Sequence, residues 1–253
     1  MKSLLEALVI AFSMYSAIPM PQIQWNKRNI ACAIAFLPAV GLVSAAGIWG
    51  LYEFCRLLSL APALFSALAV MLSILITGGI HLDGFCDTCD ALASHSSREK
   101  RLAILKDPHV GAFAVIYTCA LILLQFGAWY QLYLAPGYLA AAFSAFIISR
   151  VLASLAVLKI KKASEQGLAA TFSQSSKGLV LPLIAIAALT VTAAVLYSGW
   201  PALLAALGAL LFFMVFKRMA IKQFGGITGD LAGFLLVGSE TLMLLTAALL
   251  GAV

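Results

Sequence analysis

Residues 178–216 read GLVLPLIAIAALTVTAAVLYSGWPALLAALGALLFFMVF, without a single charged side chain. Gly199 and Pro201 separate two apolar runs, 178–198 and 200–216. A helix that crosses a bilayer needs about 20 apolar residues, and both runs approach that length. Glycine and proline together favour a tight turn. The stretch therefore predicts an antiparallel pair of membrane-spanning helices.

The composition extends this prediction to the whole chain. Of its 253 residues, 63% are hydrophobic and 10% are charged, whereas a soluble domain carries roughly a quarter charged residues. We therefore expect an all-α, polytopic membrane bundle that forms one catalytic domain over residues 1–253. The expected spans are 30–51, 59–80, 111–134, 138–158, 178–198, 200–216 and 231–252, with 4–18 as a shorter eighth segment that spans, re-enters or lies in the interface.

Basic residues orient the predicted bundle. If the spans alternate in direction, nearly all lysines and arginines outside the spans share one side, and Arg56 lies opposite. Lys and Arg collect on the cytoplasmic side of membrane proteins, so we expect this side to face the cytosol, in the cytoplasmic (inner) membrane of a prokaryote. The net charge of +6 then reflects topology, not nucleic-acid binding. The lysines and arginines on the predicted cytosolic side are Lys27, Arg28, Arg98, Lys100, Arg101, Lys106, Lys159, Lys161, Lys162, Lys177, Lys217, Arg218 and Lys222.

The first acidic cluster follows the segment 59–80. Residues 78–90 read Gly-Gly-Ile-His-Leu-Asp-Gly-Phe-Cys-Asp-Thr-Cys-Asp. In a helix, the spacings of four and seven residues place Asp83, Asp87 and Asp90 on one face. Such carboxylates repel one another unless a cation lies among them, and hard oxygen ligands suit Mg²⁺ or Mn²⁺. The alternative is a solvated acidic face at a helix end, but the apolar neighbours of these residues favour a metal site.

The second acidic cluster lies in and before the last span. Gly226, Thr228 and Gly229 form a turn that can bring backbone N–H groups close to a phosphate, although glycine turns between helices are common. Asp230 either belongs to the site or is simply a helix cap. Glu240 lies some ten residues into an apolar helix, so it needs a partner or a polar cavity.

The roles of four further polar residues each have at least two interpretations. His81 either donates to a phosphate or acts as a base, or it makes a structural hydrogen bond. Asp107 and His109 contact substrate or form a polar turn ahead of a span. Arg150 pairs with one of the acids, extends to the interface or binds a substrate phosphate. Because acids outnumber bases inside the predicted membrane region, we favour a role for Arg150 in the site.

Together these motifs resemble the cobalamin synthase family. The resemblance rests on the Gly-Gly-x-His-x-Asp-Gly-x-x-Asp-x-x-Asp string at 78–90, joined to the late Gly-Ile-Thr-Gly-Asp at 226–230 and to Glu240. It extends over nearly the whole chain and includes Leu-Lys-Asp-Pro at 105–108 and Glu-Gln-Gly-Leu at 165–168. The chain departs from the family pattern just after Pro108, where a small polar residue and a glycine are expected.

The resemblance implies an adenosylcobinamide-GDP ribazoletransferase that requires Mg²⁺. In that reaction the 3′-hydroxyl of α-ribazole, or of its 5′-phosphate, attacks the phosphoryl group attached to cobinamide, and GMP leaves. The expected partners are these small molecules and the lipid bilayer, and no nucleic acid is expected. The sequence leaves open whether the protein forms a homo-oligomer. We expect metal ligands at Asp83, Asp87 and Asp90, catalytic residues among His81, Asp230 and Glu240, and substrate contacts at Asp107, His109, Arg150, Gly226, Thr228 and Gly229.

Two other functions compete with this one. A CDP-alcohol phosphotransferase-like lipid enzyme also displaces a nucleoside monophosphate at membrane carboxylates, but its pattern has an arginine where this chain continues Ala91-Leu92-Ala93. A cation transporter would use intramembrane acids to carry ions. Transporters commonly contain inverted repeats, and no repeat is visible in this sequence.

Overall fold

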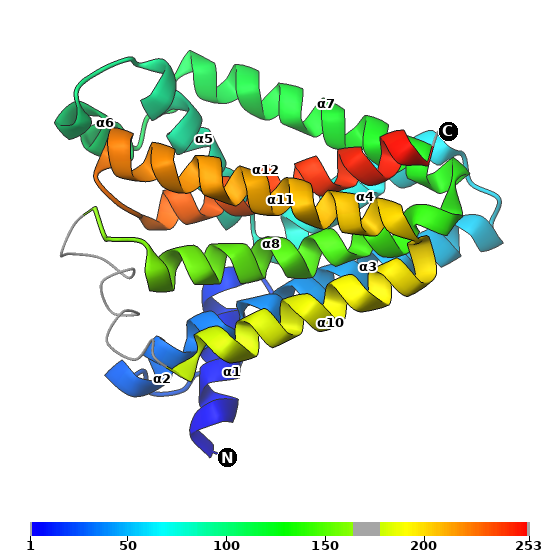
Figure 1. The fold of residues 1–253 in the computed structure, drawn as a ribbon, viewed down its shortest axis with the longest axis horizontal. Helices are drawn as coiled ribbons and strands as arrows, with labels where there is room; N and C mark the ends of the chain where they lie inside the picture. Colours follow the sequence, from blue (N-terminus) through cyan, green and yellow to red (C-terminus); the bar gives the residue numbers. More distant parts are fainter. Residues whose placement is uncertain (1, 164–177, 252–253) are drawn as a thin grey trace.

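The computed structural model describes residues 2–163 and 178–251, and in these ranges the chain is a bundle of helices (Figure 1). The predicted Glu-Gln-Gly-Leu match and Lys177 lie outside the described residues. The helices are α1 (Lys2–Tyr15), α2 (Lys27–Ala33), α3 (Leu37–Leu57), α4 (Pro62–Thr77), α5 (Ile80–Ala93), α6 (Arg98–Ile104), α7 (Ala112–Leu134), α8 (Leu139–Lys159), α10 (Val180–Ser198), α11 (Trp200–Met219) and α12 (Gly229–Leu250). Short 3₁₀ turns η1 (Ile34–Phe36) and η2 (Pro136–Tyr138) precede α3 and α8, and a π-helical turn, η4 (Ala220–Phe224), follows α11.

The described part of the chain contains 6 helical stretches long and apolar enough to cross a membrane, or up to 7 if one bent pair counts as a span. This confirms the predicted fold class, and the bounds agree with most of the predicted spans. The predicted helical hairpin around Gly199 is also present, because Gly199 joins α10 to α11, and in the same way η2 joins α7 to α8. Gly199 has a φ of 71°, which glycine adopts without steric cost.

Helix α4 fills most of the predicted span 59–80, and the prediction is wrong at its last three residues, 78–80. Helix α4 ends at Thr77, and the chain turns by 96° before α5 begins at Ile80. The reason is local, because Gly78 and Gly79 both have left-handed backbones, with φ of 63° and 78°. Two consecutive residues of this kind end a helix at low cost only when both are glycine.

Helices α8 and α12 form the centre of the bundle. Within the most apolar 18 residues of each span, 83% of the residues in α8 and 61% of those in α12 are buried. Helix α12 packs against α5, α7, α8 and α11, while α3 and α10 cover α8. Helices α10 and α11 are only 11% and 22% buried, and their exposed leucines and other large apolar side chains form an apolar outer surface. An apolar surface of this size is stable in lipid but would cause aggregation in water.

Helix α1 runs across the long axes of the other helices (Figure 1). Its apolar part, Leu4–Tyr15, is too short to count as a span. The chain after α1 is attached to the end of α4, since the backbone N–H of Ala17 donates to the carbonyl of Ile76 at 2.9 Å. Segment 4–18 is therefore not one of the long spans of the described chain, and re-entry and an interfacial position stay predictions.

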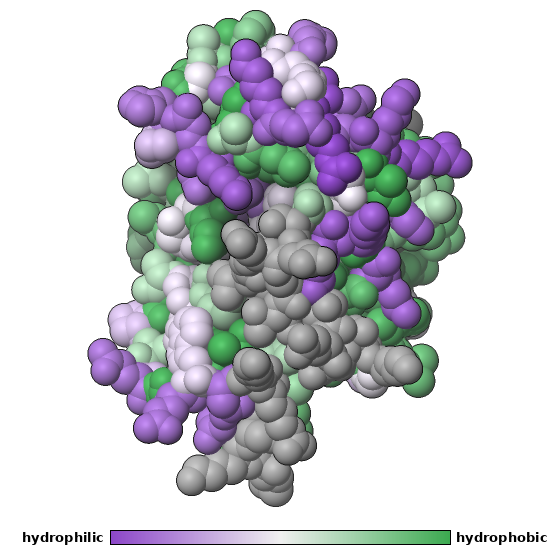
Figure 2. Space-filling view, turned by 90° about the vertical axis from the view of Figure 1, so that its left-hand side faces the viewer, coloured by the Kyte–Doolittle hydropathy of each residue, from purple (hydrophilic) through white to green (hydrophobic). Residues whose placement is uncertain are grey.

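The described basic residues gather at one end of the bundle, as predicted. There Arg101 of α6 hydrogen-bonds to Gln223 of η4, and Lys162 forms a β-bridge with Ile227. Figure 2 looks onto this end and shows hydrophilic side chains across it. Arg56 pairs with Glu53 at 2.9 Å, at the opposite end. The polarity of the bundle thus follows the prediction for the described residues.

Candidate active site

The first acidic cluster lies on α5, which begins immediately after the Gly78-Gly79 turn. Because the backbone is helical from Ile80 to Ala93, Asp83, Asp87 and Asp90 share one face, as their spacing predicts. Asp83 is exposed, and the other two are half-buried. Asp83 also lies in the first turn of the helix, where the helix dipole stabilises a negative charge.

The second acidic cluster lies at the start of α12. Thr228 caps this helix, and its hydroxyl oxygen accepts a hydrogen bond from the N–H of Leu231 at 3.2 Å. The same hydroxyl reaches Asp230 Oδ2 at 3.4 Å. The capping role considered for Asp230 is therefore performed by Thr228, whose hydroxyl also donates to the Asp230 carboxylate.

Two glycines bring the acidic clusters together. A Cβ on Gly84 would lie 2.8 Å from the carbonyl oxygen of Asp230. A Cβ on Gly233 would lie 3.0 Å from the carbonyl oxygen of His81. Helices α5 and α12 thus cross in backbone contact, which small residues permit in membrane proteins. Gly84 belongs to the first acidic motif and Gly233 follows the second, but the sequence gives no sign of this crossing.

A cavity of about 220 Å³ opens beside the crossing and receives residues of both clusters. Asp83 and Asp230 line it, and so do Tyr15 of α1 and His81 of α5. Its remaining walls are apolar and come from η1, α3, α5, α8 and α12; they include Ile34, Leu37, Ala153, Val157 and Leu236. The structure therefore joins the two sequence motifs in one concave site at the hydrophilic end of the bundle.

The charges at this site suit a divalent cation. Asp87 experiences the negative charges of Asp83, Asp90 and Asp230, so four carboxylates repel one another across the crossing. Their hard oxygen donors fit Mg²⁺ or Mn²⁺. Among the described residues, however, no group of three or more His, Cys, Asp or Glu side chains converges on a single point. The metal-ligand set stays a prediction.

The loop before α7 contacts the acidic face at one residue. The carboxylate of Asp90 lies directly against Gly111, where a Cβ would overlap it. Asp107 and His109 form a polar turn nearby, with the His109 N–H donating to Asp107 Oδ1 at 3.0 Å and the ring Nδ1 at 2.7 Å from the same oxygen. These hydrogen bonds hold the pKa of Asp107 below its usual range. The turn is exposed and does not line the cavity, and its contact with substrate stays a prediction.

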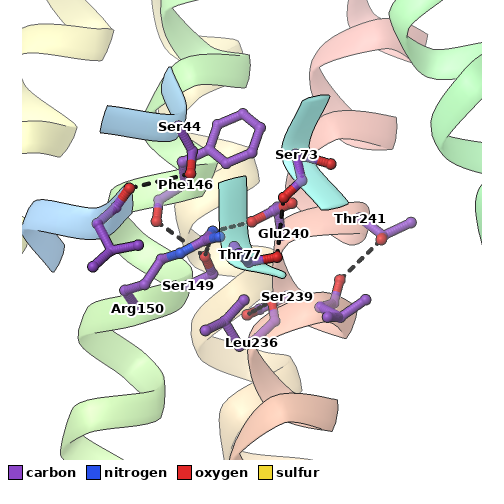
Figure 3. Close-up of polar contacts among 12 residues, drawn as sticks. Ser44, Ser73, Thr77, Phe146, Ser149, Arg150, Leu236, Ser239, Glu240 and Thr241 are labelled. Carbon is purple, nitrogen blue, oxygen red and sulfur yellow. Dashed lines mark hydrogen bonds and ion pairs between the residues drawn. The ribbon is translucent and has the colours of Figure 1, made fainter. Parts of the chain in front are cut away.

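Arg150 and Glu240 form a buried ion pair (Figure 3). Their residues are 2% and 5% exposed. Arg150 Nη1 also donates to Ser149 Oγ at 3.0 Å, and its guanidinium lies 5.4 Å from the centre of the Phe146 ring. Of the three interpretations of Arg150, pairing with an acid is the one the structure contains. The ion pair supplies the partner that Glu240 needs, and neither residue lines the cavity beside Asp83.

His81 lies between that ion pair and the acidic cavity. Its ring packs parallel to Tyr15, with ring centres 6.1 Å apart. It lines the acidic cavity and also a small space beside Arg150 and Glu240. Its Nε2 atom is buried and makes no hydrogen bond within the described part of the chain. The structural hydrogen bond that the sequence offered for His81 is therefore not present at this nitrogen.

The bundle and its site define a class: a multi-pass helical membrane protein with two acidic motifs joined at one end. Residues 7–248 match the family described as cobalamin-5-phosphate synthase, and the chain belongs to this family.

Curated relatives carry one name, adenosylcobinamide-GDP ribazoletransferase. The protein of Lachnoclostridium phytofermentans is 42% identical over 93% of this chain and 90% of its own length. A protein of Clostridium botulinum is 33% identical over 98% and 99%, and one of Brevibacillus brevis is 31% identical over 95% and 97%. No solved structure matches the chain.

Proposed function

We propose that this chain joins α-ribazole, or its 5′-phosphate, to adenosylcobinamide-GDP and releases GMP. Membership of the family and the shared name of the relatives support this reaction. The observation that carries the proposal is the contact of Gly84 with Asp230, because it places the carboxylates of two distant motifs around one cavity. Phosphoryl transfer depends mainly on positioning and on neutralising charge.

The proposed reaction is a substitution at phosphorus. The 3′-hydroxyl oxygen of ribazole forms a bond to the phosphorus attached to cobinamide. The bond from that phosphorus to the bridging oxygen of the pyrophosphate breaks, and GMP leaves. The hydroxyl proton passes to a base or to water, and a base in that position contributes roughly 10²–10⁴-fold to the rate.

Several residues have separate roles in this proposal. Asp83, Asp87 and Asp90 hold Mg²⁺, which when bound neutralises charge on the diphosphate. Asp230 lies across the same cavity, where it completes the site or accepts the proton of the hydroxyl. His81 forms part of the wall between them. Thr228 and the neighbouring glycines shape the turn that carries Asp230.

The location follows from the distribution of charge. The described basic residues surround the end of the bundle that contains the acidic cavity. By the bias of Lys and Arg toward the cytoplasmic side, we propose that this end faces the cytosol across the cytoplasmic membrane. Basic residues around the cavity also attract an anionic nucleotide substrate.

The test is GMP release by the full chain in lipid nanodiscs, from adenosylcobinamide-GDP and α-ribazole 5′-phosphate, with and without Mg²⁺. We expect metal-dependent release that Asp83→Asn abolishes. Glu53→Gln, at the opposite end of the bundle, is the matched control and keeps its activity. Folded wild-type protein that releases no GMP with any divalent metal would refute the assignment. Release of CMP from a CDP-alcohol instead would support the lipid enzyme.

A further inference from the structure

The acidic cavity has two chemically different parts. One part contains the carboxylates of Asp83 and Asp230, at the first turns of α5 and α12. The other is apolar and reaches into the bundle. Leu236 lies six residues beyond Asp230 on α12, which is about 9 Å along the helix axis at 1.5 Å per residue. A ligand that fills the cavity therefore needs a polar and an apolar end.

The size of the cavity narrows the choice of ligand. Its volume of about 220 Å³ is below the roughly 300–1,000 Å³ of pockets for drug-sized molecules. It accommodates a fused aromatic base and part of the attached sugar, but not a corrin ring with its attached GDP. A lipid chain has no polar group to place against the carboxylates of Asp83 and Asp230. A diphosphate suits the metal-binding end at the carboxylates, but it would find no hydrogen-bond partner along the apolar walls.

We infer that this cavity binds the acceptor nucleoside, and that its apolar part selects the base. This inference rests on the proposed function, in which the acceptor is ribazole, a nucleoside with a fused aromatic base. The base lies in the apolar part, between α8 and the η1–α3 segment, and the sugar hydroxyls point toward Asp83 and Asp230. The attacking hydroxyl is thus directed to the carboxylates, while the much larger second substrate remains outside.

Ala153 and Val157 are the residues that determine which base fits. They lie four residues apart on α8, so both face the cavity from adjacent turns. They are 2% and 5% exposed, and their side chains are small. One methylene gained or lost in an apolar pocket changes discrimination between ligands by roughly 10–200-fold. The size of these two side chains therefore sets the size limit for the base.

The experiment compares kcat/KM for three acceptor nucleosides with the full chain in nanodiscs. Their bases are benzimidazole, 5,6-dimethylbenzimidazole and the wider naphthimidazole. Ala153→Leu fills the cavity and should lower kcat/KM for the dimethylated nucleoside at least 10-fold more than for the unsubstituted one. Val157→Ala only removes atoms, and it should shift selectivity in the opposite direction, toward the naphthimidazole nucleoside. Ala185→Leu, on the exposed face of α10, is the matched control and should leave all ratios unchanged.

The possible failures are distinguishable. Wild-type protein that releases no GMP with any of the three nucleosides would reject the proposed function itself. If the wild type is active and each variant lowers kcat/KM equally for all three nucleosides, the base pocket is rejected while the proposed function stands. A general structural disturbance would lower all three values alike, because it does not discriminate between bases. Opposite shifts in the ratios for the two α8 variants would support the inference. If Ala153→Leu does not fold, an unchanged ratio in Val157→Ala is sufficient to overturn it.

Discussion

The ion pair between Arg150 and Glu240 allows a quantitative prediction. Glu240→Gln would leave the Arg150 guanidinium buried without a counter-charge, since its only other hydrogen bond in the described structure is to Ser149. Removing one partner of a buried pair costs roughly 3–5 kcal/mol. Arg150→Met would leave the opposite charge unpaired and should cost a similar amount. The double variant has no buried charge and should recover most of this loss.

The assay is a double-mutant cycle. The free energy of unfolding is measured by denaturant titration in lipid or mild detergent for the wild type, both single variants and the double variant. We expect a coupling of at least about 2 kcal/mol, well beyond the additivity of independent sites, about 0.3–0.5 kcal/mol. Glu53→Gln, which breaks an exposed pair, is the control and should change stability little. Additive losses would refute the reasoning and return Arg150 to a role in binding substrate.

Two further predictions concern glycines at the site. Gly84→Ala should force α5 and α12 apart, because its Cβ would lie 2.8 Å from the Asp230 carbonyl oxygen; we expect a loss of roughly 1–3 kcal/mol in stability and of most GMP release. Gly127→Ala on α7 has nothing within 4 Å and is its control; equal behaviour of the two variants would contradict the close crossing. Gly111→Ala should displace the Asp90 carboxylate and raise the Mg²⁺ concentration needed for half-maximal activity. An unchanged Mg²⁺ dependence would show that Asp90 is not a ligand.

The membrane spans could be predicted from the sequence because hydropathy alone specifies them. Apolar runs of about 20 residues have no other stable place, and most of the predicted bounds match the helices. The exception is 59–80, where the run of apolar residues continues past the point at which the helix ends. There two left-handed glycines decide the geometry, and a hydropathy pattern does not report backbone dihedrals.

The candidate site could be predicted only in part. Spacing along one helix is local information, so the shared face of Asp83, Asp87 and Asp90 was predictable. Gly84 and Asp230 are 146 positions apart in the sequence, and their contact depends on how α5 and α12 pack. A glycine within an acidic motif indicates close helix packing, but the sequence does not identify the residue it packs against.

Arg150 illustrates the same limit. The sequence allowed pairing, interfacial extension and phosphate binding, because each suits an arginine in an apolar helix. Only the packing of α8 against α12 places it beside Glu240. Polar groups buried in a bundle find partners on other helices, and those partners are set by the tertiary structure.

The central claim is that the two acidic motifs act as one site. The most direct test is GMP release by Asp83→Asn, Asp230→Asn and the double variant, in nanodiscs with saturating Mg²⁺. Residues that act as a unit show strongly non-additive losses, so we predict that each single variant loses nearly all activity and that the double variant is scarcely worse. Losses that multiply, or an Asp230→Asn variant with wild-type activity, would contradict the claim and separate the two motifs.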